Sequence, residues 1–163
     1  MKIKNFILIA CISILYSCGK DNSDYQGPVA AGSEKYVFTK WGTTIADVEK
    51  FMGSSNGWSA ETNPSGLQTF HYTEEFLKNK GWTGFKVVSY EFTGGILSSA
   101  TALLSNDGGN VDKITSRYLS GFTYLGDKNS TRVFVDESNN SVAIVYEVTD
   151  NQANYFAIGW TSL

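Results

Sequence analysis

The feature that most constrains the fold is an order of helical and strand-like periodicities that occurs twice along the chain. Residues 43–53 and 110–119 each carry apolar side chains at helical spacing behind a capping residue, Thr44 in the first segment and Asn110 in the second. Four runs with the two-residue period of strands follow each segment. The runs are residues 57–61, 67–74, 87–93 and 98–104 after the first helix, and residues 123–127, 131–138, 143–149 and 154–160 after the second.

This repeated order predicts an α+β fold. It consists of two tandem α-β-β-β-β repeats, residues 35–105 and 106–163, that form one antiparallel sheet with the helices packed on one face. Residues 87–93 align on residues 143–149 without a gap, and the Tyr, Glu and Thr of the two segments match. The first repeat differs mainly by an insertion at 75–82, and duplicated units place such insertions in loops. A chance likeness between two α+β halves is the alternative.

Strand alternation assigns the side chains of both repeats to two faces. The face predicted to meet the helices holds Val88, Tyr90, Phe92, Ala100, Ala102, Leu104, Ile144, Tyr146, Val148, Phe156, Ile158 and Trp160. The face predicted to stay partly open is mixed in character and holds Thr69, His71, Thr73, Val87, Ser89, Glu91, Val133, Val135, Ala143, Val145, Glu147 and Tyr155. An antiparallel sheet commonly leaves one face to solvent, so the mixed face is a candidate binding surface.

The first residues of the chain have the pattern of an export signal. Lys2 and Lys4 precede a short apolar run over residues 6–15, which predicts a signal peptide at residues 1–17. The run is shorter than the roughly 20 apolar residues that a membrane-spanning helix needs. Residues 18–34 are rich in Gly, Ser, Asp and Asn, a composition that is typical of a flexible tether.

The end of this signal, Leu15-Tyr16-Ser17-Cys18, resembles the lipobox of bacterial lipoproteins. The resemblance implies cleavage before Cys18, attachment of diacylglyceryl and palmitate chains to that residue, and a membrane bound through this lipid anchor. Gly19, in place of an aspartate that favours the inner membrane, indicates the outer membrane of a Gram-negative bacterium, facing the periplasm or the cell surface. An ordinary signal peptide with a chance cysteine is the alternative.

Two further resemblances concern the folded part. The order of helices and strands is similar to the tandem α+β repeat of the β-lactamase inhibitory protein family. Residues 41–53, with Trp41-Gly42-Thr43-Thr44 and Met52-Gly53, resemble the opening of the small outer-membrane lipoproteins related to BamE. Both families act by binding protein, so the resemblances imply a protein partner and no catalytic residue.

Composition excludes several other functions. The chain has 13 basic and 16 acidic residues, a net charge of −3, and therefore no basic stripe for a nucleic acid. One His and two Cys supply too few ligands for a metal site or a cofactor cluster. No G-x-S-x-G motif surrounds a serine that could act with His71. We therefore expect no metal, no cofactor and no enzymatic activity.

The predicted function is that of a membrane-anchored, non-catalytic envelope lipoprotein that binds a protein partner through the open sheet face. Candidate binding residues are those on the mixed face and one aromatic residue in the insertion: His71, Trp82, Glu91, Val145, Glu147 and Tyr155. The alternative is a glycan-binding or glycan-cleaving surface lipoprotein that uses Trp82 and Tyr155 as aromatic contacts. In that alternative Glu91 and Glu147 would form a carboxylate pair about 5–9.5 Å apart.

Overall fold

The structure, a computed structural model of the 163-residue chain, describes residues 37–53, 58–62, 66–106, 111–128, 130–150 and 153–163. The predicted signal peptide, the tether with Cys18, and the predicted helix cap Asn110 lie outside the described residues. Within the described part of the chain, no helix has the length and apolar character that crossing a bilayer requires.

Eight strands form one sheet in which all neighbours are antiparallel. They are β1 (Trp58–Thr62), β2 (Gln68–Thr73), β3 (Phe85–Thr93), β4 (Ile96–Ser105), β5 (Thr123–Lys128), β6 (Thr131–Asp136), β7 (Ser141–Asp150) and β8 (Ala153–Ser162). Each strand overlaps one of the predicted runs, and the mixed α+β class with an antiparallel sheet is confirmed. The spatial order is β1-β2-β3-β4-β8-β7-β6-β5, so β4 pairs with β8 in the middle of the sheet.

Three helices are described: α2 (Ile45–Met52), α3 (Glu74–Asn79) and α4 (Val111–Tyr118). The start of α2 agrees with the sequence, because Asp47 Oδ2 accepts hydrogen bonds from the Thr44 amide at 2.9 Å and the Thr44 hydroxyl at 2.8 Å. Gly53 ends this helix at a φ of 84°, a conformation that glycine adopts without strain.

The helix α3 was not predicted, and it occupies the insertion between β2 and β3. It has 6 residues, too few to display a helical period, and only Leu77 is buried. Thr73 ends β2 and also caps α3, because its hydroxyl accepts a hydrogen bond from the Phe76 amide at 3.4 Å.

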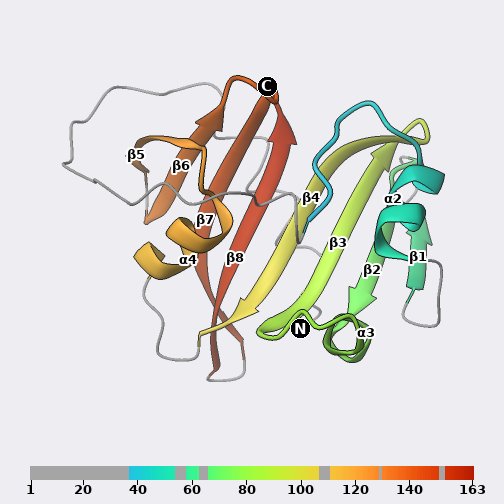
Figure 1. Cartoon of the computed structure of the whole chain (residues 1–163), viewed down its shortest axis with the longest axis horizontal. Helices are drawn as coiled ribbons and strands as arrows, with labels where there is room; N and C mark the ends of the chain where they lie inside the picture. The colour runs from blue at the N-terminus through green and yellow to red at the C-terminus, as the bar shows by residue number, and fades with distance from the viewer. Residues whose placement is uncertain (1–36, 54–57, 63–65, 107–110, 129, 151–152) are drawn as a thin grey trace.

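All three helices lie on one side of the sheet (Figure 1). Met52 of α2, Leu77 of α3 and Tyr118 of α4 belong to a single buried cluster with side chains from this side of the sheet. One row of that cluster crosses six strands and mixes aromatic residues with alanine: Phe70, Tyr90, Ala100, Trp160, Ala143 and Phe134. The main core therefore lies between the helices and this face of the sheet.

Residues 37–44, here called the strap, connect the two halves of the sheet. The Phe38 amide donates to the Tyr90 hydroxyl on β3 at 3.0 Å. The Trp41 indole Nε1 donates to the Ser141 hydroxyl on β7 at 2.6 Å. The strap thus holds β3 and β7 in a fixed relation before the chain enters α2.

The predicted faces are correct for β3 and wrong for β7. Ala143 and Val145, which the alternation placed on the open face, are 0% and 1% exposed and belong to the core beneath the helices. Ile144 and Tyr146, which it placed beneath the helices, belong to a separate cluster on the opposite face. Every side chain of β7 is therefore assigned to the face opposite to the predicted one.

An irregularity in the β3–β4 hairpin explains this error. The β3–β4 register shifts between Glu91 and Phe92, whereas β7 and β8 pair without a shift. When the hairpins are aligned at their turns, Thr93 corresponds to Asp150, an offset of 57 residues instead of the 56 of the gapless alignment. Because side chains alternate with a period of two, this change of one residue exchanges the faces.

Candidate functional site

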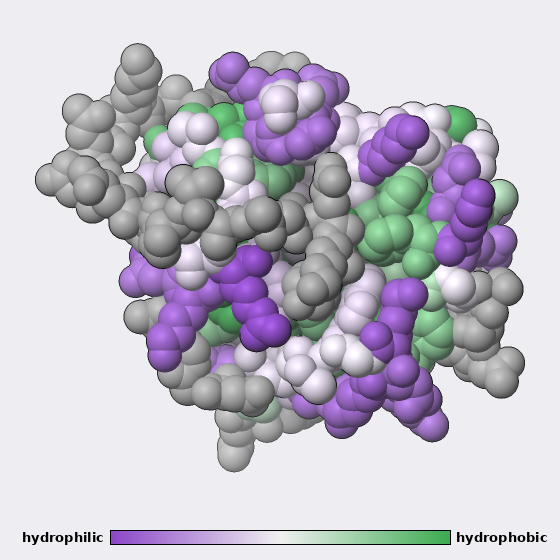
Figure 2. All heavy atoms as spheres, in the orientation of Figure 1, coloured by the Kyte–Doolittle hydropathy of each residue, from purple (hydrophilic) through white to green (hydrophobic). Residues whose placement is uncertain are grey.

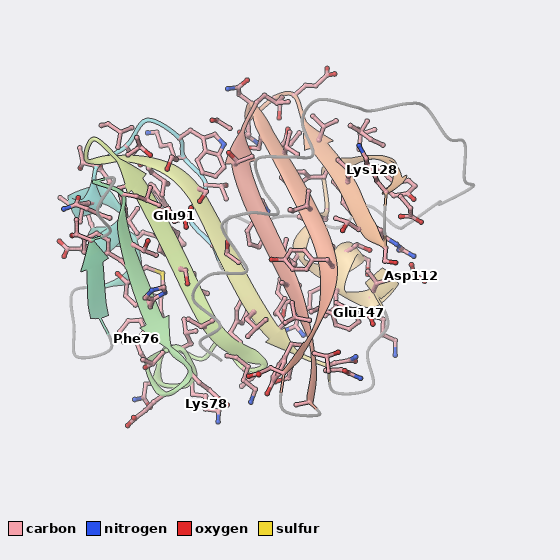
Figure 3. All side chains as sticks on the ribbon, turned by 180° about the vertical axis from the view of Figure 1, so that it is seen from behind. Phe76, Lys78, Glu91, Asp112, Lys128 and Glu147 are labelled. Atoms are coloured by element: carbon pink, nitrogen blue, oxygen red, sulfur yellow. The ribbon has the colours of Figure 1, made fainter. Side chains whose placement is uncertain are left out.

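The candidate surface is the face of the sheet opposite the three helices, here called the distal face (Figure 3). No described helix packs on it, and its side chains come from β2, β3, β4, β6, β7 and β8. Partly exposed side chains on this face are Thr69, His71, Val87, Glu91, Tyr146, Val148, Tyr155 and Thr161. Aromatic, aliphatic, hydroxyl and carboxylate groups are therefore presented together.

Two cross-strand contacts fix polar groups on the distal face. His71 Nδ1 lies 2.8 Å from the Ser89 hydroxyl on the neighbouring strand. The Ser99 hydroxyl on β4 donates a hydrogen bond to a carboxylate oxygen of Glu91 on β3. His71 and Glu91 are thus placed on this face as the sequence predicted, and each is held by a serine of the adjacent strand.

An aliphatic cluster occupies the other half of the distal face. It consists of Val133, Val142 and Ile144, with Tyr146 packed at its edge. Tyr155 also lies on this face, because its cross-strand partner Val148 alternates with the buried residues of β7. The distal face is therefore more polar near β2 and β3 and more apolar near β6 and β7.

Trp82 does not belong to this surface. It is 7% exposed and packs in the main core, with its ring centroid 5.6 Å from that of Phe85 and 6.3 Å from that of Phe51. The Lys80 ammonium lies 5.6 Å from the ring centroid and donates hydrogen bonds to the carbonyls of the last turn of α2. The prediction that Trp82 is a binding anchor is wrong, because the insertion folds back over the core.

Val145 and Glu147 also lie on the helix-bearing side. Val145 is buried there, and Glu147 is exposed beside Arg132 and Val111 of α4 along a cleft. Glu91 is on the distal face, so the strand registers place the two glutamates on opposite faces of the sheet. The carboxylate pair of Glu91 and Glu147, which the glycan-cleaving alternative requires, is therefore not formed, because the sheet separates the two side chains.

A second hollow on the helix-bearing side was missed by sequence reasoning. It is a cleft of about 620 Å³ between the strap, α2 and the turn that joins β6 to β7. Its lining residues are Phe38, Thr39, Lys40, Trp41, Phe51, Ser138, Asn139 and Asn140. These residues are far apart in the sequence, and only the pairing of β8 with both β4 and β7 brings them together.

The β6–β7 turn at this cleft is organised by Asp136. Its carboxylate accepts hydrogen bonds from the amide and hydroxyl of Ser138 at 3.1 and 2.6 Å, and from the amide and side chain of Asn139 at 3.2 and 2.6 Å. Burial acts to raise the pKa of Asp136, but these hydrogen bonds outweigh it and hold the pKa below its usual value of 3.8. The turn is therefore built around an ionised carboxylate.

Acidification is expected to weaken this turn. Because the pKa of Asp136 is lower in the folded than in the unfolded chain, its contribution to the free energy of unfolding is complete above the unfolded pKa. That contribution is lost as the pH falls through the lowered folded value. Urea unfolding at about pH 7 and about pH 3 brackets the ordinary Asp pKa. The wild type should lose more stability between these conditions than Asp136→Asn. An equal loss in both proteins would show that Asp136 is not the responsible group.

In the described part of the chain, no group of three or more His, Cys, Asp or Glu side chains is placed to hold a metal ion. Comparisons with family models, with curated proteins and with solved structures gave no match. The function is therefore inferred from the geometry of the residues themselves.

Proposed function

We propose that this chain is a non-catalytic lipoprotein of the bacterial cell envelope that binds a protein partner through the distal face. The observation that carries the proposal is a sheet face without a described helix, on which Tyr146 and Tyr155 stand partly exposed among aliphatic and polar side chains. Protein interfaces combine an apolar centre with a polar rim, and tyrosine is enriched among the residues that dominate binding.

The distribution of groups on this face supports that assignment. The aliphatic cluster of Val133, Val142 and Ile144 supplies an apolar centre, and Tyr146 lies at its edge. The His71–Ser89 and Glu91–Ser99 pairs supply polar groups that are already oriented. A partner with an apolar ridge and flanking hydrogen-bonding groups fits this arrangement, and serine-bound side chains lose little conformational freedom on binding.

Membrane attachment through Cys18 is the second part of the proposal. The lipobox-like sequence before Cys18 supports lipidation, and the outer membrane, facing the periplasm or the cell surface, is the proposed location. Two or more acyl chains are sufficient for stable anchoring, at about 0.8 kcal/mol per buried methylene group. The partner would then be another protein of the cell envelope.

The replacement Cys18→Ser is expected to abolish lipidation. Cells that make the protein would be fed an alkyne analogue of palmitate, and the wild type should carry the label and sediment with membranes. The serine variant has no thiol at position 18, so it should carry no label and be released from the membrane fraction. Retention of label by the variant would contradict the assignment of Cys18.

We further propose that the sheet consists of two tandem α-β-β-β-β repeats, residues 35–105 and 106–163. The strand order supports this, because β1 to β4 follow α2 and β5 to β8 follow α4. Outward from the central β4–β8 pair the two groups have the same order, β4-β3-β2-β1 on one side and β8-β7-β6-β5 on the other. In this interpretation α3 is an addition to the first repeat. The likeness to the β-lactamase inhibitory protein family would then extend to the use of a sheet face for protein binding.

Site-specific crosslinking in the envelope tests the binding face. A photoreactive phenylalanine analogue at Tyr155, on the distal face, should crosslink to one protein species of discrete mass. The same analogue at Ala46, an exposed position on α2, is the matched control and should give no such product. The Tyr155 product should also disappear in the Tyr146→Asp variant if that variant remains folded. Crosslinks from Ala46 alone would place the partner on the helices and contradict the proposal.

A further inference from the structure

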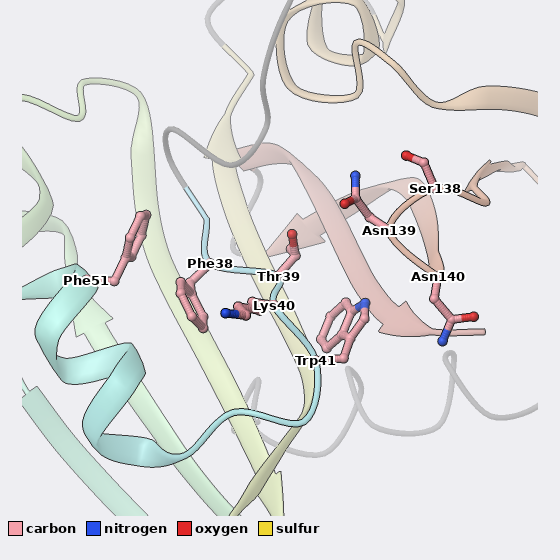
Figure 4. Close-up of a pocket in the computed structure, with 8 residues that line it drawn as sticks. All are labelled: Phe38, Thr39, Lys40, Trp41, Phe51, Ser138, Asn139 and Asn140. Atoms are coloured by element: carbon pink, nitrogen blue, oxygen red, sulfur yellow. The ribbon is translucent and has the colours of Figure 1, made fainter.

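The cleft beside the strap has a lining that the proposed protein-binding function does not use. It lies on the helix-bearing side. Figure 4 shows Phe38 and Phe51 on the side of α2, and Trp41 between them and the turn that carries Ser138, Asn139 and Asn140. Its volume of about 620 Å³ falls within the range of small-molecule sites, roughly 300–1,000 Å³. Figure 2 shows hydrophobic atoms gathered beside α2 among hydrophilic ones.

The aromatic rings of the cleft are held in place by the fold. The Trp41 indole donates to the hydroxyl of Ser141, which is 1% exposed and itself donates to the Asn139 carbonyl at 3.1 Å. The Phe38 backbone is bound to Tyr90, and its ring centroid lies 5.2 Å from that of Phe51. The three rings are only partly buried, so they present fixed aromatic surface to a ligand.

The polar groups of the lining are amides, hydroxyls and one ammonium group. The Asp136 carboxylate holds Ser138 and Asn139 in position, and Asn140 follows them with a φ of 51°. Carboxamides both donate and accept hydrogen bonds, as do the hydroxyl groups of sugars. Hydrogen bonds or ring contacts thus hold residues at both the aromatic and the polar end of the lining.

These groups discriminate between classes of ligand. No carboxylate is found among the described lining residues, and this disfavours a divalent cation. Among the described residues that line it, Lys40 is the only basic one and none is an arginine, so these residues would neutralise a nucleotide or another phosphate poorly. A pyranose has an apolar C–H face that packs on the electron-rich face of an aromatic ring, and hydroxyls around its edge that pair with amides.

We propose that this cleft binds a saccharide of one or two pyranose units, with a sugar face on the Trp41 ring and its hydroxyls on Asn140 and the neighbouring turn. This site is separate from the distal face. A failure of one proposal therefore leaves the other unaffected.

The test exploits the backbone conformation of Asn140. Asn140→Gly removes the carboxamide, and glycine readily adopts the positive φ of 51° at this position. Ser130→Gly is the matched control, because Ser130 has a φ of 63° and lies on another turn, outside the cleft. Both variants are expected to fold, and only the first changes the proposed site.

Saturation-transfer NMR and calorimetry would use the full-length protein in a detergent without a sugar headgroup. The probes are N,N′-diacetylchitobiose, maltose, cellobiose and digalacturonic acid, each at up to about 10 mM, which reaches the weak end of specific binding. At least one probe should bind the wild type and the Ser130→Gly control equally. Asn140→Gly should weaken that binding about 3- to 10-fold, the loss expected for one hydrogen-bonding group.

The Trp41→Ala variant adds a larger change. It should abolish saturation transfer to the sugar ring protons if the variant folds, because the aromatic platform is gone. The Asn140→Gly result remains decisive if Trp41→Ala does not fold. Absence of binding for every probe would overturn the proposal. Binding that Asn140→Gly leaves unchanged would also overturn it, because the sugar would then occupy another part of the molecule.

Discussion

Replacement of Trp160 by Ala is expected to lower the free energy of unfolding by about 3–5 kcal/mol, the range for large aromatic residues in well-packed cores. Trp160 is 1% exposed on β8, at the centre of the sheet. Its cross-strand neighbours on the helix-bearing face are Ala100 of β4 and Ala143 of β7. The indole therefore fills the space above two alanines, and these small residues cannot close the cavity that its removal leaves.

A conservative variant separates the contribution of ring volume from that of the indole nitrogen. Trp160 Nε1 is buried without a hydrogen-bond partner among the described residues. Trp160→Phe removes this unpaired donor, which is stabilising, and also part of the ring volume, which is destabilising. Because the two effects oppose each other, the variant should lower the free energy of unfolding by only about 1 kcal/mol. Urea denaturation with parallel fluorescence and circular dichroism measures both variants. If Trp160→Ala lowered the free energy of unfolding by less than about 1 kcal/mol, the row of side chains that includes Ala100, Trp160 and Ala143 would not be packed as described.

The sequence predicted the number of strands and their positions along the chain, because the alternation of side chains within each strand is a local property. It also predicted α2, where Thr44 and Asp47 form a capping box that depends on residues three positions apart. Helix α3 was missed because its 6 residues are fewer than two turns. Trp82 was misplaced for a related reason, since the path of the insertion over the core depends on contacts with Phe51, distant in the sequence.

The candidate sites were less predictable than the fold. His71, Glu91 and Tyr155 were placed on the correct face because the alternation in their own strands is regular. The cleft at Trp41 and Asn140 carries no local signal, because it forms only where the strap meets a turn about 100 residues later, as the Trp41–Ser141 separation shows. To find such a site from sequence, one would need a conserved pattern that links the strap to the β6–β7 turn.

The faces of β7 provide the second large expected effect, because the structure and the simple alternation predict opposite outcomes. The Ala143 side chain is fully buried between those of Trp160 and Phe134 on the helix-bearing face. In the gapless alignment it would lie on the open face, where an acidic residue costs little. Ala143→Asp should therefore lower the free energy of unfolding by about 3–5 kcal/mol, since it buries a charge with no partner.

Tyr146→Asp on the same strand is the matched comparison. Tyr146 is partly exposed at the edge of the aliphatic cluster on the distal face, and a carboxylate there can reach water. Tyr146→Asp should therefore lower the free energy of unfolding by only about 1 kcal/mol. Urea unfolding of the two variants at neutral pH gives both values. If Tyr146→Asp were the more destabilising of the two variants, the side chains of β7 would lie on the faces that the gapless alignment predicts. Val145 and Glu147 would then lie on the distal face. If Ala143→Asp is the more destabilising, as expected, Ile144 and Tyr146 lie on the distal face, which is the surface proposed to meet the partner. A folded Tyr146→Asp protein that no longer crosslinks through Tyr155 would then show that this arrangement of β7 matters for binding.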